Sequence, residues 1–148
     1  MELSTKGRYA VMALIDLASN GGEHGSVSLA DIASRQSISL SYLEQLFARL
    51  RRRGIVVAKR GPNGGYRLAK PAGVIDVASV VFAVDETVKF TACDPEKEGG
   101  CGGRKARCVA HGLWVAMTAH IQDFMASVTL EDILQNKFEK AELGEKAA

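Results

Sequence analysis

The sequence predicts a mainly helical protein with one small β-hairpin, and three features of its 148 residues carry that prediction. Apolar residues recur at the spacing of amphipathic helices along most of the chain. A glycine-rich stretch at residues 60–65, flanked by two short runs typical of strands, interrupts the helical spacing. All three cysteines fall between two helical patterns, within residues 93–108. With 47% hydrophobic residues, the chain can fill the core of one ordinary domain, or of a small domain with an added oligomerisation element.

Two helices are predicted in the first part of the chain. The first begins at the N-cap candidates Ser4 and Thr5 and continues to about Ser19, where Asn-Gly-Gly ends it. A second, short helix follows Ser28, which forms the Ser-x-x-Asp variant of a capping box with Asp31.

The third helix, from about residue 40 to residue 53, has one apolar and one polar face. Its apolar side chains recur at i, i+3, i+4 and i+7, and are Leu43, Leu46, Phe47 and Leu50. The opposite face carries small and amide side chains with an arginine behind them, namely Ser41, Gln45, Ala48 and Arg52, with Glu44 on its flank. Two helices joined by a short turn, the second with such an exposed face, are the layout of a helix-turn-helix.

A hairpin directly follows this helix, with strands predicted at residues 55–59 and 66–69. A hairpin in this place is the wing of a winged helix-turn-helix. Its tip places Arg60 beside backbone amides at Asn63 and Gly64 that can approach phosphate, and narrow A·T-rich minor grooves attract such an arginine. The alternative is a turn that only reverses the chain. The glycines form neither a Walker motif nor a dinucleotide-binding motif.

The formal net charge of +2 hides an uneven distribution. Residues 45–75 contain no acidic residue and eight basic ones, which are Arg49, Arg51, Arg52, Arg53, Lys59, Arg60, Arg67 and Lys70. Beyond His120, six acidic residues face three lysines. This asymmetry is typical of a head that binds a polyanion and a tail that stays solvated. The alternative is that the basic run is only a solvated surface.

The stretch from Cys93 to His111 predicts a metal site. Three soft thiolates, from Cys93, Cys101 and Cys108, and the imidazole of His111 make a full ligand set for tetrahedral Zn²⁺ or for an iron–sulfur cluster. Four glycines let the backbone fold tightly around such a site. Two alternatives remain open: the cysteines are ordinary loop residues, or His111 only begins the next helix and another group completes the ligand set.

The cysteine count also bears on the compartment. Three cysteines cannot pair completely within one chain, and a reducing compartment would keep their thiols free for metal. The sequence shows no apolar run of transmembrane length and no signal-type segment at its N-terminus. We therefore expect a cytoplasmic protein with no membrane partner.

The C-terminal half predicts a means of self-association. Asp76 caps a short helix, and a long amphipathic helix begins near Val109. The long helix carries an apolar stripe that a small head cannot cover, made up of Leu113, Met117, Ile121 and Phe124. We predict that this stripe packs against its copy in a homodimer, and the alternative is that it folds back on its own head. Thr129 and Asp132 cap a last short helix.

These elements divide the chain into four parts. We predict a winged helix-turn-helix DNA-binding head at residues 1–85 and a cysteine-rich loop that binds the metal at 86–111. A long C-terminal dimerisation helix and a short terminal helix follow at 109–137, and a disordered tail at 138–148.

Four motifs followed by the cysteines and the histidine resemble the IscR family of iron–sulfur cluster regulators. They are Ser-Thr-Lys-Gly-Arg-Tyr-Ala at 4–10, Ile-Ser-Leu-Ser-Tyr-Leu-Glu-Gln-Leu-Phe at 38–47, Arg-Gly-Pro-Asn-Gly-Gly-Tyr at 60–66 and Ala-Val-Asp-Glu at 83–86. The resemblance extends to about residue 135. It implies a dimeric winged-helix transcription factor that senses cluster supply, represses cluster-assembly genes and receives its cluster from the assembly machinery.

The resemblance also implies particular residue roles. It assigns a 2Fe-2S cluster to Cys93, Cys101, Cys108 and His111, base-edge contacts to Ser41, Glu44 and Gln45, and the minor groove to Arg60. The gaps between the four ligands are seven, six and two residues, and the first two exceed those of the best-known members. Related iron-responsive regulators with similar spacing carry 4Fe-4S clusters, so both cluster types stay open.

Two other classes of function were compared with this one. A purely structural zinc site in a DNA-binding protein fits the same four ligands. An enzyme is not expected, because the sequence contains no nucleophile elbow, no H-E-x-x-H motif and no paired carboxylates framed by glycine.

Overall fold

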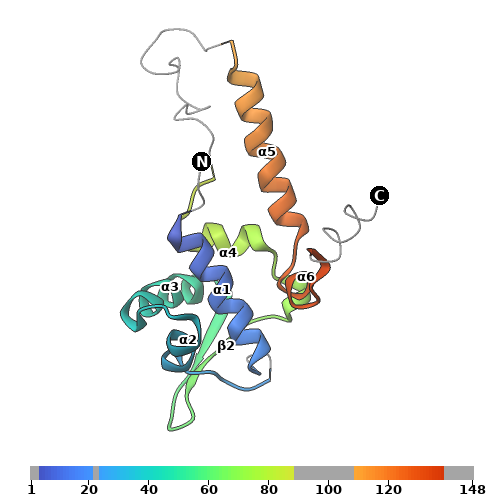
Figure 1. Ribbon diagram of the computed structural model, residues 1–148. Coiled ribbons are helices and arrows are strands. Elements are labelled where there is room, and N and C mark those ends of the chain that lie inside the picture. Colours follow the sequence, from blue (N-terminus) through green and yellow to red (C-terminus); the bar gives the residue numbers. More distant parts are fainter. Residues whose placement is uncertain (1–3, 22–23, 89–108, 139–148) are drawn as a thin grey trace.

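The computed structural model describes residues 4–21, 24–88 and 109–138. Six α-helices, a 3₁₀ turn and one hairpin occur there, and Figure 1 shows the first four helices gathered around the hairpin, with a long fifth helix rising from them. In chain order they are α1 (Thr5–Ser19), α2 (Leu29–Gln36), α3 (Leu40–Arg52), β1 (Val56–Lys59), β2 (Gly65–Leu68), η1 (Ala72–Val74), α4 (Val77–Ala83), α5 (His111–Ser127) and α6 (Leu130–Leu134). The predicted winged helix-turn-helix fold is confirmed, with most bounds within two residues.

Side-chain caps fix where most of these helices begin. The hydroxyl of Ser4 accepts from the backbone of α1, and the carboxylate of Asp76 accepts from the amide of Ser79 at 2.7 Å. At the start of α6, Thr129 and Asp132 form both halves of a capping box. Each cap satisfies an amide that the first helical turn leaves without a partner. The sequence therefore encodes these helix starts locally, through residues at most three positions apart.

The main core lies between α1, α3 and the hairpin. The four predicted apolar residues of α3 are all buried, and the ring of Phe47 meets Tyr66 of β2 edge-on, with centroids 5.0 Å apart. β1 and β2 pair antiparallel, from Val56 opposite Leu68 to Lys59 opposite Gly65. This packing holds the hairpin against α3. The two candidate DNA-binding elements therefore rest on the same closely packed core and keep a fixed position relative to each other.

A second attachment fixes the wing to the chain that precedes α2. The amides and carbonyls of Val27 and Tyr66 exchange hydrogen bonds of 2.9 and 2.8 Å. A Cβ at Gly65 would lie 2.3 Å from the Val27 carbonyl oxygen, so only glycine allows this close approach.

α6 belongs to the core of the head. Leu130 is fully buried in the main core, its amide donates to the Ile75 carbonyl at 3.0 Å, and the amide of Val77 donates to the Val128 carbonyl at 2.9 Å. The predicted division grouped this short terminal helix with the dimerisation helix at 109–137, and in the structure α6 packs against the head. A five-residue helix is stable only against a core, and here its one buried residue, Leu130, packs into the core of the head.

α5 touches the head only near its C-terminal end. Met125 is buried and Ile121 half-buried against a second, smaller apolar cluster that includes Ala78, Val81 and Val88. Towards its N-terminus the helix extends away from the head (Figure 1). In the part of the chain that the structure describes, no helix combines the length and the apolar character needed to cross a membrane.

Candidate nucleic-acid interface and the approach to the cysteine stretch

The predicted reading face of α3 is open to solvent. Ser41, Glu44, Gln45 and Arg52 are all exposed, whereas the opposite side of the helix is buried. Ser39, which the sequence analysis did not identify as a cap, accepts from the amide of Tyr42 at 3.4 Å, and its hydroxyl lies 3.0 Å from that of Ser41. The cap fixes the start of α3, and the exposed face has the side-chain types that can meet base edges in a major groove.

The wing presents Arg60 and Asn63 as exposed residues, whereas Gly64 is half-buried. The Gly64 amide donates to the Gly61 carbonyl at 2.9 Å, and a Cβ at Gly64 would lie 2.6 Å from the Lys59 carbonyl oxygen. This amide is therefore already used inside the turn. Gly64 therefore shapes the wing turn, and its contact with DNA stays a prediction.

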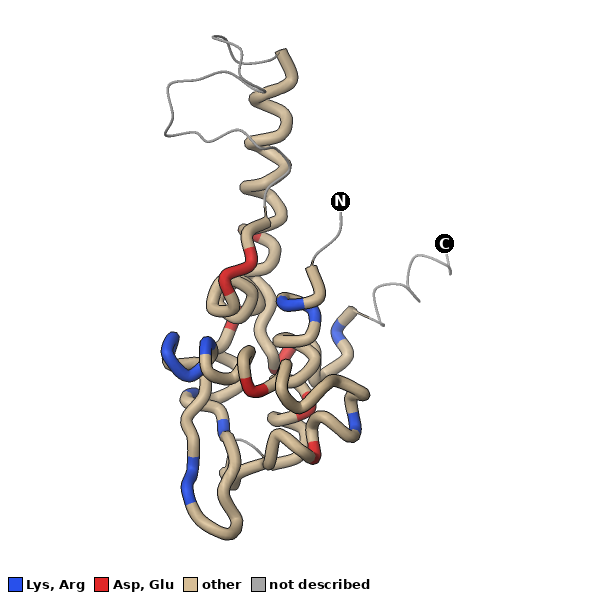
Figure 2. Tube along the Cα trace, turned by 90° about the vertical axis from the view of Figure 1, so that its left-hand side faces the viewer, with Lys and Arg blue, Asp and Glu red and all other residues tan. Residues whose placement is uncertain are grey.

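The wing tip is also held in place from outside. The hydroxyl of Ser26 donates to the carbonyl of Asn63 at 2.8 Å, which leaves the Asn63 side chain exposed. Figure 2 shows that basic residues gather at the end of α3 and along the wing on the same side of the head. A surface of this kind attracts a polyanion before any specific contact forms.

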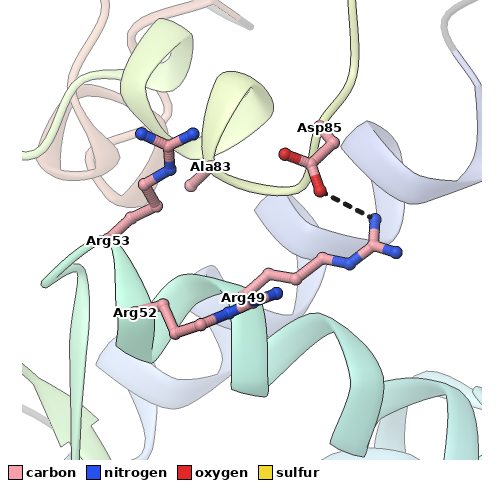
Figure 3. A pocket seen from close by; sticks show the side chains of 5 residues that line it. All are labelled: Arg49, Arg52, Arg53, Ala83 and Asp85. Atoms are coloured by element: carbon pink, nitrogen blue, oxygen red, sulfur yellow. Dashed lines mark ion pairs between the residues drawn. The ribbon is translucent and has the colours of Figure 1, made fainter.

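Three arginines from the end of α3 line a depression beside the end of α4 (Figure 3). Arg49 reaches across it, donating to the Val84 carbonyl at 3.0 Å and lying 3.4 Å from a carboxylate oxygen of Asp85. Arg52 and Arg53 also line the depression, and neither pairs with a carboxylate among the residues that the structure describes. One acidic group thus faces three guanidinium groups, and two remain for an external anion.

The α1 and α2 helices are fixed to each other by a buried carboxylate. Asp16 is 6% exposed, and Arg35 donates to both of its oxygens, with its Nη2 atom 2.6 Å from Oδ1. Gln36 adds a hydrogen bond of 2.8 Å. Burial alone would raise the pKa of the Asp16 carboxyl, but these hydrogen bonds and the charge of Arg35 outweigh it and lower the pKa below its usual value. The ionised carboxylate and its hydrogen bonds therefore hold α2, the helix before the turn, in place against α1.

Of the four predicted metal ligands, only His111 lies within the described ranges. It is the first residue of α5 and is half-buried. Cys93, Cys101 and Cys108 fall outside the described residues. The chemistry of the donor set fits an iron–sulfur group, because soft thiolates and an imidazole are its ligands and the positive end of the α5 dipole favours negative charge beside His111.

The exposed side of α5 carries most of the predicted interface residues. Leu113 is 56% exposed and Phe124 55%, and Met117 is exposed as well. Ile121 differs, because it packs partly against the head. A helix with large apolar residues turned to solvent over much of its length needs a further surface to cover them.

The region of this chain that matches known proteins includes both the winged head and α5. Residues 3–136 match the Rrf2 family, described as iron-dependent transcriptional regulators. The HTH-type transcriptional regulator IscR of Photorhabdus laumondii is 51% identical over 137 residues, which are 93% of this chain and 81% of that protein. Among solved structures, T. potens IscR superposes with a TM-score of 0.74 at 36% identity, covering 93% of this chain and 88% of the other.

The same fold also occurs in a cysteine regulator. CymR, the global cysteine regulator of B. subtilis, superposes with a TM-score of 0.74 at 28% identity, covering 92% of this chain and 98% of its own. The fold, the exposed reading helix and the basic wing define a winged helix-turn-helix regulator of transcription, which binds DNA and is not an enzyme. The chain belongs to the Rrf2 family of iron-dependent transcriptional regulators.

Proposed function

We propose that this regulator senses the supply of iron–sulfur clusters and that cluster occupancy changes which DNA sites it binds. One observation carries the proposal: the match to an iron-dependent regulator family spans both the reading head and the stretch that contains Cys93, Cys101, Cys108 and His111. These four residues would hold the cluster. The bound cluster would link these residues to one another, and its presence would depend on iron and sulfide. The protein would act in the cytoplasm and repress cluster-assembly genes.

The reading head supports a division of labour on DNA. Ser41 and Gln45 are exposed on α3 and can donate to or accept from base edges, while Arg52 reaches phosphates. Arg60 and Asn63 of the wing meet the neighbouring minor groove.

Glu44 gives the reading face its selectivity. A carboxylate can accept from the amino group of cytosine, but it repels phosphate and the acceptor oxygen of thymine. We propose that Glu44 makes the cluster-free protein reject one class of site. Replacing Glu44 with Ala should remove that rejection, measured as the ratio of affinities for two duplexes by fluorescence anisotropy. An unchanged ratio in the cluster-free protein would exclude this role.

The apolar side of α5 supports a homodimer. Leu113, Met117 and Phe124 would pack against the same helix of a second copy, with Ile121 at the edge of the contact. Two heads held in this way contact half-sites about 34–36 Å apart, one turn of the duplex. The angle between the heads then decides which operators fit.

The choice between cluster and zinc has a direct experimental answer. Protein purified without oxygen should be coloured, with iron and sulfide in equal amounts, and the shape of its visible spectrum separates 2Fe-2S from 4Fe-4S. A structural zinc site gives no visible absorption and no sulfide. The family match favours the cluster, and 2Fe-2S is the type we propose.

A further inference from the structure

We propose that Arg49 is a positioning residue, which transmits the state of the cysteine stretch to the recognition helix through its contacts with Val84 and Asp85. This inference rests on the proposed function, because it names the route by which a bound cluster would alter DNA reading. It concerns the segment of residues 84–88, the last described residues before the cysteine-containing stretch.

Segment 84–88 touches three elements at once. On one side Arg49 of α3 binds the Val84 carbonyl at 3.0 Å and the Asp85 carboxylate at 3.4 Å. On another, Glu86 accepts from both the amide, at 3.3 Å, and the hydroxyl of Ser4, the residue that caps α1. A five-residue segment therefore contacts the start of one DNA-head helix and the end of another.

The far end of the segment is attached to α5. The Val88 carbonyl accepts from the side-chain amide of Gln122 at 3.3 Å, and the Val88 side chain is buried in the same cluster as Met125. Cys93 follows five positions later in the chain, and His111 opens α5. The segment is therefore joined by the chain to one predicted ligand and by the Val88 contacts to the helix that begins with another.

The backbone of the segment contains one residue in the left-handed conformation. Asp85 has φ of 57°, in the left-handed region that residues other than glycine seldom adopt. Its amide donates to the Phe82 carbonyl at 3.1 Å and so closes the end of α4. Because the two acceptors for Arg49 are consecutive residues, a change in this turn moves the Val84 carbonyl and the Asp85 carboxylate together.

Arginine suits this position for a geometric reason. A planar guanidinium can engage a carbonyl and a carboxylate at the same time, so it follows the turn as a unit. Arg49 lies one helical turn beyond Gln45 on α3, and a helix moves as a rigid body. A shift of segment 84–88 would therefore reach the reading face directly.

Three variants separate this role from simple loss of charge. Arg49→Gln removes both contacts. Asp85→Asn removes only the ion pair, and asparagine, like aspartate, is among the non-glycine residues that adopt the left-handed conformation most often. Arg53→Gln is the matched control, because Arg53 lines the same depression but, among the described residues, no hydrogen bond or ion pair joins it to segment 84–88, so loss of its charge should weaken DNA binding by the cluster-loaded and stripped forms alike.

For each full-length variant, the dissociation constant of the cluster-loaded form is divided by that of the stripped form, and this ratio is measured for each of two DNA duplexes. The probes are two duplexes selected from random sequence, one by each form, and the visible spectrum gives cluster content. Hydrogen exchange of the last turn of α3 is followed in the stripped protein. We expect wild type and Arg53→Gln to have the same ratio. Asp85→Asn should bring the ratio closer to one by up to about fivefold, which corresponds to the upper range for an exposed ion pair. Arg49→Gln should bring the ratio still closer to one and should speed hydrogen exchange in the last turn of α3.

The outcomes are distinguishable. If both variants load cluster and keep the wild-type ratio and exchange rates, the role of Arg49 is overturned while the proposed function stands. If wild type itself binds cluster without a change in DNA choice, or binds none, the proposed function fails, and the transmission fails with it. Loss of the ratio in Arg53→Gln as well would also count against Arg49, because it would assign the effect to charge alone.

Discussion

Replacing Asp16 with Asn should destabilise the head by about 2–3 kcal/mol at neutral pH, since hydrogen bonds to a charged group contribute about 1.5–3 kcal/mol each and part of this is screened. Asp16 is 6% exposed and accepts from Arg35 through both carboxylate oxygens and from Gln36 at 2.8 Å. An amide in its place keeps the shape but offers one acceptor and turns an N–H group toward Arg35. The screening is partial because the Arg35 side chain is 39% exposed.

The same contacts predict a pH dependence. The pKa of Asp16 is lowered in the folded state: burial opposes this, and the hydrogen bonds from Arg35, Gln36 and Asn20 produce it. A lowered carboxyl pKa contributes stability that is fully present above the unfolded value of about 3.9 and is lost as the pH falls through the folded value. The wild-type protein should therefore lose this contribution in acid, and Asp16→Asn lacks it at every pH.

Urea unfolding followed by circular dichroism at pH 7 and pH 3 measures both effects. The difference in unfolding free energy between wild type and Asp16→Asn should be large at pH 7 and smaller at pH 3. Asp123→Asn is the matched control, because Asp123 is exposed on α5, and its change should stay within about 0.5 kcal/mol. A difference for Asp16→Asn that is equally small, or that does not shrink in acid, would refute the role assigned to this network.

Three further predictions concern the wing, the dimer and the metal ligand. Gly64→Ala should abolish tight DNA binding with unchanged helix content, because its Cβ would meet the Lys59 carbonyl at 2.6 Å; full affinity in a binding titration would contradict this. Leu113→Glu should yield monomers in light scattering, since a charge on an apolar seam is not covered, whereas a persistent dimer would place the interface elsewhere. His111→Cys should retain its visible absorption longer in air, because thiolate binds more strongly than a protonatable imidazole, and equal loss rates would remove His111 from the ligand set.

The helices and the hairpin could be predicted from the sequence because each depends on residues that lie close to one another in the chain. The buried face of α3 follows from residues spaced three and four apart, and the caps at Ser4, Ser28 and Thr129 act within three residues. The wing followed from its turn residues. The exposure of Arg60 and Ser41 followed in turn from the placement of those elements.

Contacts between residues distant in sequence could not be predicted in this way. Arg49 and Val84 are 35 positions apart, and nothing in the pattern of α3 separates Arg49 from its neighbouring arginines. The return of Leu130 to the head core depends on the whole fold, since the cap at Thr129 predicts where its helix begins but not which surface it packs against. Gly64 was predicted to present its amide outward because turn composition does not reveal which amide the turn uses.

The central claim is that metal occupancy at Cys93, Cys101, Cys108 and His111 governs the choice of DNA site. The most direct test takes one anaerobic preparation, measures its affinity for the two selected duplexes, strips the cluster with a chelator and an oxidant, re-reduces the thiols and repeats the titration. We predict that the order of preference, or at least the ratio of the two affinities, changes when the visible absorption is lost. An identical ratio before and after complete loss of iron and sulfide would contradict the account.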